Sequence, residues 1–215
     1  DIYDEMISNG SLEDDLCQRK IVDQLENINR KVSDLKKKSI FFKKVPDING
    51  AYIWGGVGCG KSMLMDLFVE NLPIPNRRVH FHAFMQEIHN SLHKARSSGV
   101  KDPLALVANE VTKNFKVLAF DEMQIKDITD AMIVGRLFTL LLDGGVIIIT
   151  TSNRAPSDLY KNGLNRELFV PFIDLISNRL NILNLESKID YRKSKLRGAR
   201  VYFSPLNANS KNNLD

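Results

Sequence analysis

With 215 residues, 43% of them hydrophobic and 26% charged, the chain is long enough for one α/β domain with a large core, with or without short extensions. The formal net charge of +4 does not by itself indicate a nucleic-acid-binding protein, and the absence of any uncharged apolar run of about 18 residues predicts no membrane span. Two cysteines, Cys17 and Cys59, are too few for a disulfide framework and are typical of a reducing compartment.

Residues 1–45 are predicted to form a helical segment followed by a basic linker. Apolar residues recur there at near-helical spacing, at Leu12, Leu16, Val22, Leu25, Ile28 and Val32. Lys36–Lys38 and Lys43–Lys44 then flank Phe41-Phe42. This basic run is compatible with a nucleic-acid or acidic partner, or with a solvated linker. The linker is favoured because the run is short and acidic residues lie nearby, so nucleic acid is not the expected partner.

Residues 55–62 read G-x-x-x-x-G-K-S, between the apolar run Ala51–Trp54 and a helix-forming run that begins at Met63. This is the pattern of the phosphate-binding loop, whose backbone N–H groups and helix N-terminus favour anions. Lys61 is predicted to contact the β- and γ-phosphates, and Ser62 to ligate Mg²⁺. The residues predicted to bind the nucleotide are Gly55, Gly56, Val57, Gly58, Cys59, Gly60, Lys61, Ser62 and Met63.

Strand-like and helix-like segments alternate after this loop. The predicted strands cover 51–54, 78–82, 117–120, 146–151 and 180–185. The predicted helices cover 63–71, 83–97, 103–113, 127–142 and 165–176. Five strands alternating with helices predict one parallel sheet. His80 and His82 would share a face of the second strand, but no third ligand lies at a telling spacing, so a metal site is not expected there.

Two carboxylates, Asp121 and Glu122, directly follow the apolar strand Val117–Phe120. Ligand chemistry in open α/β sheets lies at such strand ends. Asp121 is predicted to hold Mg²⁺ opposite Ser62, and Glu122 to activate the attacking water. Glu122 therefore favours hydrolysis over binding alone, although two carboxylates that merely solvate a strand end would look the same.

Asn153 follows the strand 146–151, at the position known as sensor 1 in AAA+ ATPases, where it would lie near the γ-phosphate. The alternative is that Asn153 only forms a turn. Around these residues the chain resembles the ZapE family of bacterial cell-division ATPases, which includes the mitochondrial Afg-one-like (lactation-elevated) ATPases. The resemblance runs from about Tyr3 to about Leu206. It is carried by Val79–Met85, Phe120–Gln124, Asp127–Met132, Thr151–Arg154, Leu159–Arg166, Phe169–Ile173 and Asp190–Arg192.

The resemblance implies an AAA+ P-loop NTPase fold, with a five-stranded parallel sheet in the order 5-1-4-3-2 flanked by helices, and a homo-oligomer driven by ATP. It implies an arginine finger, for which Arg166 is the first choice and Arg154 the second, although a surface salt bridge of Arg166 stays open. Gln18 matches a family position that could touch the adenine. Phe84-Met85 could grip a substrate, but core packing is favoured.

The family also carries a helical lid with a second sensor arginine. We expect an ATPase core at 46–206, a tail at 207–215 and no lid before Asp215, which would weaken turnover and ring assembly. The partners implied by the resemblance are cell-division ring components in the bacterial cytoplasm, or inner-membrane proteins if the chain is mitochondrial and lies in the matrix. A nucleotide-dependent binding module with little turnover and a helicase-loader-like ATPase remain the alternatives.

Overall fold

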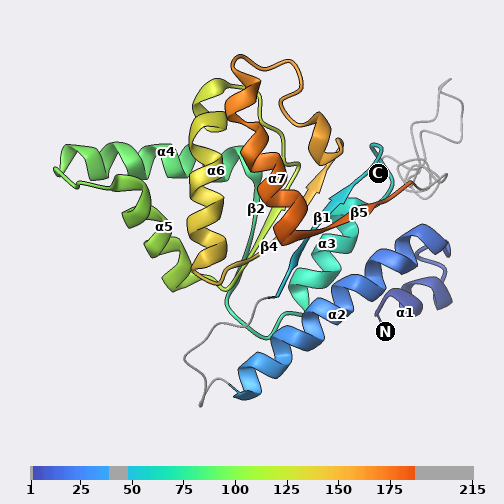
Figure 1. Cartoon of the computed structure of the whole chain (residues 1–215). Helices are drawn as coiled ribbons and strands as arrows, with labels where there is room; N and C mark the ends of the chain where they lie inside the picture. Colours follow the sequence, from blue (N-terminus) through green and yellow to red (C-terminus); the bar gives the residue numbers. More distant parts are fainter. Residues whose placement is uncertain (1, 39–47, 187–215) are drawn as a thin grey trace, which may run out of the picture.

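The computed structural model describes residues 2–38 and 48–186. Figure 1 shows one parallel β-sheet with helices on both faces. Its strands are β1 (Gly50–Trp54), β2 (Asn76–His80), β3 (Val117–Asp121), β4 (Ile147–Ser152) and β5 (Leu180–Asn184). They lie in the order β2-β3-β4-β1-β5, and every neighbouring pair is parallel. Read from the other edge, this is the order 5-1-4-3-2 that the resemblance implied.

The helices pack on the two faces of the sheet, one group on each (Figure 1). One face carries α1 (Ile2–Ser8), α2 (Leu16–Lys38) and α3 (Lys61–Glu70). The other carries α4 (Phe81–Ser97), α5 (Pro103–Asn114), α6 (Ile128–Asp143) and α7 (Val170–Arg179), while two 3₁₀ turns, η1 (Pro156–Asp158) and η2 (Arg166–Leu168), precede α7. This arrangement explains why residues 147–151 of β4 are all β-branched: each residue of the strand is buried, on one face or the other.

Helix starts follow the capping residues of the sequence. The Asp102 side chain accepts a hydrogen bond from the Ala105 N–H and begins α5, with Pro103 in the first turn. In the same way, the Asp127 side chain accepts from the Asp130 N–H and begins α6. These caps satisfy backbone donors that a helix N-terminus otherwise leaves without partners.

The second strand differs from its prediction. It spans Asn76–His80, and residues 81 and 82 already belong to α4. Phe81 is fully buried and packs edge-on against Phe120, with ring centroids 5.8 Å apart. His82 is exposed on the helix, so it shares no strand face with His80. The prediction of a strand through residue 82 was wrong, because Phe81 packs against Phe120 of β3 as the first residue of α4.

A second difference precedes α7. The predicted helix 165–176 is divided into η2 and a helix that begins at Val170. Pro171 explains the break, because a proline ring would clash with the carbonyl four residues earlier in a continuous helix. Asn165 has φ of 54°, which also lies outside helical geometry.

The N-terminal part is helical, as the apolar spacing predicted, although Leu16 is exposed. Lys36–Lys38 are the last residues of α2 rather than part of a linker. The predictions for Lys43–Lys44, Asp190–Arg192 and the tail 207–215 fall outside the described residues. Within the described ranges, no helix combines the length and the apolarity that a membrane crossing requires.

Phe84 and Met85 lie near the start of α4. Both side chains are buried in the core that this helix forms with the sheet. This position favours core packing over an exposed substrate-gripping loop, as the sequence interpretation preferred.

Candidate functional site

The loop between β1 and α3 has the backbone of an anion site. Gly60 is the N-cap of α3 with φ of 94°, a left-handed conformation that favours glycine. No side chain caps this helix end. The first N–H groups of α3 therefore have no intrahelical acceptor and are oriented to bind an anion, with the helix dipole behind them.

Lys61 lies inside this loop. Its side chain is only 8% exposed, and Nζ donates to the carbonyl oxygens of Gly55 at 2.9 Å and Gly56 at 2.5 Å. The Cys59 Sγ is 3.7 Å from the same nitrogen. Because these partners are neutral, the ammonium charge is not cancelled and remains available for a phosphate group. The structure thus places Lys61 within the phosphate loop, and its contact with the phosphates stays a prediction.

Asp121 gathers partners from several elements at the carboxyl end of β3. Its Oδ1 accepts from Ser62 Oγ at 2.9 Å and from Thr151 Oγ1 at 2.6 Å. Its Oδ2 accepts from Arg78 Nη2 at 2.8 Å. The structure thus brings Ser62 and Asp121 together as predicted. Thr151 and Arg78 were missed; a hydroxyl at the end of the adjoining strand was the available signal for Thr151.

The oxygen atoms of Ser62 and Asp121 fit a magnesium ion by their chemistry, because Mg²⁺ prefers hard oxygen ligands and usually keeps only one or two from the protein. In residues 2–38 and 48–186, no group of three or more His, Cys, Asp and Glu side chains is arranged to hold a metal ion. A magnesium ion here would therefore be completed by phosphate oxygens and water. Ser62 and Asp121 are the two residues that would hold it.

Glu122 directly follows the buried Asp121 but is itself exposed. Its φ is 55°, so the chain leaves the strand in a left-handed turn at this residue. Its N–H donates to Thr151 Oγ1 at 3.0 Å. One threonine hydroxyl thus binds both acidic residues of the pair, through the side chain of Asp121 and the backbone of Glu122.

Asn153 lies beside the other site residues at this edge of the sheet. It follows β4, which pairs with β1 on one side and β3 on the other. The preceding Ser152 donates from Oγ to the Met123 carbonyl at 2.9 Å, and its own carbonyl accepts from the Gly55 N–H at 3.2 Å. The Asn153 side chain is exposed there. It therefore emerges between the phosphate loop and the Asp121–Glu122 pair.

The candidate arginines lie farther along the same connection. Arg166 in η2 donates from Nη2 to the Ser157 carbonyl at 2.6 Å, and its Nε is buried without a hydrogen-bond partner. Arg154 is exposed, and its carbonyl accepts from the hydroxyl of Tyr52 at 2.9 Å. Lys161, which is hydrogen-bonded to Asp158, lowers the pKa of that carboxyl, with smaller contributions from the two arginines. Arg154 and Arg166 therefore both lie near Asp158 of their own chain.

Gln18, which the resemblance made a possible adenine contact, binds the backbone of the phosphate loop in the structure. Its side chain is fully buried, and Nε2 donates to the Cys59 carbonyl at 2.9 Å. It thus packs behind the phosphate loop, against the backbone.

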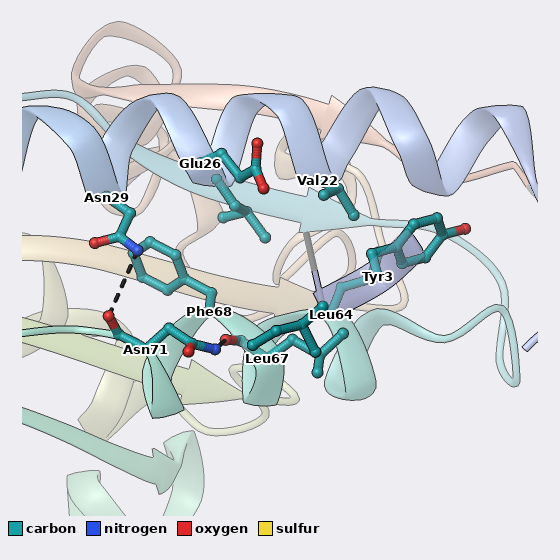
Figure 2. Close-up of a pocket in the computed structure, with 10 residues that line it drawn as sticks. Tyr3, Val22, Glu26, Asn29, Leu64, Leu67, Phe68 and Asn71 are labelled. Atoms are coloured by element: carbon teal, nitrogen blue, oxygen red, sulfur yellow. Dashed lines mark hydrogen bonds between the residues drawn. The ribbon is translucent and has the colours of Figure 1, made fainter. Parts of the chain in front are cut away.

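A cavity of about 260 Å³ lies between α2 and α3 (Figure 2). Tyr3 lies at one end, and a long contact of 3.5 Å between Asn29 Nδ2 and the Asn71 carbonyl lies at the other (Figure 2). Its walls come from α1, α2 and α3 and from Asn71, and no residue of the phosphate loop 55–62 lines it. The cavity is therefore separate from the candidate nucleotide site.

Comparisons with known proteins agree on the family. The family model described as AFG1-like ATPase matches residues 1–215. The cell division protein ZapE of Escherichia coli is 36% identical over 231 aligned positions, which cover 99% of this chain and 61% of that protein. Lactation elevated protein 1 homolog B of Danio rerio is 41% identical over 191 positions, which cover 83% of this chain and 37% of that protein. The chain thus spans between about a third and three fifths of the length of these relatives.

Among solved structures, AMPPCP-bound DnaA from Aquifex aeolicus superimposes with a TM-score of 0.58 at 16% identity, covering 88% of this chain and 54% of that one. This likeness shows the fold alone, that of AAA+ P-loop ATPases. The expected fold class is therefore confirmed.

Proposed function

The chain belongs to the AFG1-like ATPase family, and from this premise we propose that it binds ATP with Mg²⁺ at residues 55–62 and hydrolyses it to ADP and phosphate. The observation that carries the proposal is the 2.9 Å hydrogen bond between Ser62 Oγ and Asp121 Oδ1. It joins the phosphate loop to the acidic strand end, so that a phosphate site and a magnesium site adjoin.

The remaining residues of the site have complementary roles in this proposal. Lys61 and the loop N–H groups bind the phosphates and stabilise the charge that develops on them. Glu122, exposed beside the buried Asp121, orients the attacking water and accepts its proton. Asn153 helps to hold that water from the neighbouring strand. Magnesium, when bound, neutralises charge on the phosphate oxygens.

We further propose that Arg166 acts on the site of a second copy of the chain, with Arg154 as the alternative. Arg166 lies in an exposed turn flanked by Leu164 and Leu168, which are 69% and 64% exposed. Exposed apolar side chains around a partly buried arginine are typical of protein–protein contacts. An arginine from a neighbour would couple hydrolysis to assembly.

The relative named for cell division supports a protein partner in that process, and hence the bacterial cytoplasm. The relative named lactation elevated protein supports the alternative, inner-membrane proteins and the mitochondrial matrix. In either case ATP hydrolysis would drive remodelling or regulation of the partner protein.

The test compares ATP binding and phosphate release for the wild type, Glu122→Gln and a control, Glu110→Gln, an exposed acid on α5. Glu122→Gln should keep ATP affinity and lose turnover by roughly 100-fold or more, the usual size of a lost general base. The control should match the wild type. ATP binding with no turnover in any variant would instead support the nucleotide-dependent binding module.

A further inference from the structure

Gln18 connects the N-terminal helices to the phosphate loop through both ends of its amide. The Tyr3 hydroxyl on α1 donates to Gln18 Oε1 at 3.0 Å. Gln18 Nε2 on α2 donates to the Cys59 carbonyl at 2.9 Å. Both side chains are buried, with Tyr3 2% exposed. The result is a hydrogen-bonded chain from α1 through α2 to the loop, shielded from water.

The contact at Cys59 determines where the next N–H points. In a trans peptide the C=O and the N–H project in opposite directions. Because the Cys59 carbonyl points inward to Gln18, the Gly60 N–H points outward, toward the face of the loop where an anion would bind. Gln18 therefore sets the orientation of one donor of the phosphate site without touching the phosphate.

The backbone of the loop is in direct contact with this amide. A Cβ built on Gly60 would lie 2.6 Å from Gln18 Nε2, so a side chain at this position would require the amide to shift, besides being strained by the φ of 94°. Gly60 and the Gln18 amide are thus in close contact, so an inward shift of the loop at Gly60 would displace the amide.

Tyr3 fixes the direction of the Gln18 amide. Its hydroxyl donates to Oε1, so the NH₂ end faces the loop. Burial raises the pKa of Tyr3, with the backbone N–H of Asp15 as the largest opposing influence, so the hydroxyl keeps its proton near neutral pH. If the amide turned over, Oε1 would face the Cys59 carbonyl, and two acceptors would repel each other.

We propose that Tyr3 and Gln18 are positioning residues for the nucleotide site: they hold the Cys59–Gly60 peptide with its N–H toward the phosphates, and they link the docking of α1 to phosphate binding. This inference rests on the proposed ATP binding. Linkage is reciprocal, so a docked α1 raises nucleotide affinity, and bound nucleotide stabilises the docking of α1 by the same factor.

The first test measures binding of a fluorescent ADP analogue and of ATP to the full chain, with and without Mg²⁺. Tyr3→Phe keeps the ring but removes the donor, and should weaken binding by roughly three- to tenfold, about the value of one hydrogen bond. Gln18→Met, of similar size but without hydrogen bonds, should weaken binding at least as much. The control, Val22→Ala, removes cavity packing on α2 without touching this chain of bonds, and should stay within about twofold of the wild type.

The second test asks whether the two residues act together. In the Gln18→Met background, Tyr3→Phe should have no further effect on affinity, whereas independent effects would multiply. ATP should also slow amide hydrogen exchange in α1 of the wild type and not in Tyr3→Phe. The melting temperature of Gln18→Met shows whether this variant folds. If it does not fold, the test rests on Tyr3→Phe alone, through its nucleotide affinity and the amide hydrogen exchange of its α1.

If Tyr3→Phe bound nucleotide as tightly as the wild type, the positioning role would be overturned while the proposed function stood. The same holds if the losses of affinity in the two single variants multiplied in the double variant. Absence of any nucleotide binding by the wild type would overturn the proposed function as well. The two failures are therefore distinguishable.

Discussion

Arg78 and Asp121 are joined across neighbouring strands, with Arg78 Nη2 2.8 Å from Asp121 Oδ2. The strand register explains the contact. Arg78 lies opposite Ala119, and a residue two positions further along β3 projects from the same face. The same guanidinium reaches Asp66 on α3, with 2.5 Å between Nε and Oδ1. Arg78 on β2 therefore forms ion pairs with both β3 and α3 at the edge of the site.

Replacing Arg78 by alanine should destabilise the fold. Asp121 is buried and would lose a charged hydrogen-bond partner, which costs about 1–3 kcal/mol, whereas the half-exposed Asp66 adds little. The measurement is urea unfolding of the nucleotide-free chain. Arg136→Ala is the matched control, because its pair with Asp102 is exposed on both sides and should be worth about 0–1 kcal/mol. Equal losses in the two variants would contradict the role given to Arg78.

Thr151→Val should impair both stability and turnover. The valine has nearly the same shape but cannot bind Asp121 or the Glu122 N–H, so about 1–3 kcal/mol of folding free energy should be lost. ATP hydrolysis should fall with it because both acidic residues lose a support. Thr151→Ser, which keeps the hydroxyl, should restore most of both.

The neighbouring threonine separates these effects. Thr150 is equally buried, but its hydroxyl donates to the Phe120 carbonyl at 3.2 Å and not to the acidic pair. Thr150→Val should therefore lose stability, by about 0.5–1.5 kcal/mol, and leave turnover per folded molecule unchanged. A Thr150 variant that is as inactive as the Thr151 variant would show that any damage to this strand end stops hydrolysis.

The helix cap Asp102 should contribute to acid sensitivity. The Ala105 N–H, and then Arg136, hold the pKa of Asp102 below its usual value in the folded chain. Its contribution to stability is therefore present above the usual aspartate pKa and is lost as the pH falls through the lower, folded value.

Asp102→Asn can still cap α5 but does not titrate. Between about pH 5 and pH 3, its melting temperature should consequently fall less than that of the wild type. The measurement is a series of thermal melts across this range. Parallel curves for the two proteins would refute the assignment.

Phe138 should be a determinant of the core. It is fully buried on α6, and its ring centroid lies 5.6 Å from that of Phe120 and 5.1 Å from that of Phe172. Phe138→Ala should cost about 3–5 kcal/mol of unfolding free energy, because a cavity replaces the ring. Met132→Ala on the same helix, at a side chain 67% exposed, should change it by no more than about 0.5 kcal/mol. Chemical denaturation of the two variants and the wild type measures both changes.

The phosphate loop, Asp121 and the strand at 146–151 could be predicted from the sequence because their signals are local: a fixed spacing, a strand end and an apolar run. Thr151 offered only the signal of a hydroxyl at a strand end, and Arg78 offered none, because the contacts of both residues depend on which strands are neighbours and in what register. The resemblance singled out Gln18 but did not show its contacts with Tyr3 and Cys59. Helical spacing identified its helix, while only packing shows that its amide faces the back of the loop.

The left-handed conformation of Glu122 lowers the stability of the fold at a residue with a proposed catalytic role. A side chain with a Cβ loses about 1–2 kcal/mol in that conformation, and glycine would adopt it at no such cost. Selection for a stable domain alone would therefore favour glycine at this position. In the proposed mechanism the carboxylate of Glu122 acts at this strained position, so Glu122→Gly should give a more stable protein that has lost most of its ATP turnover.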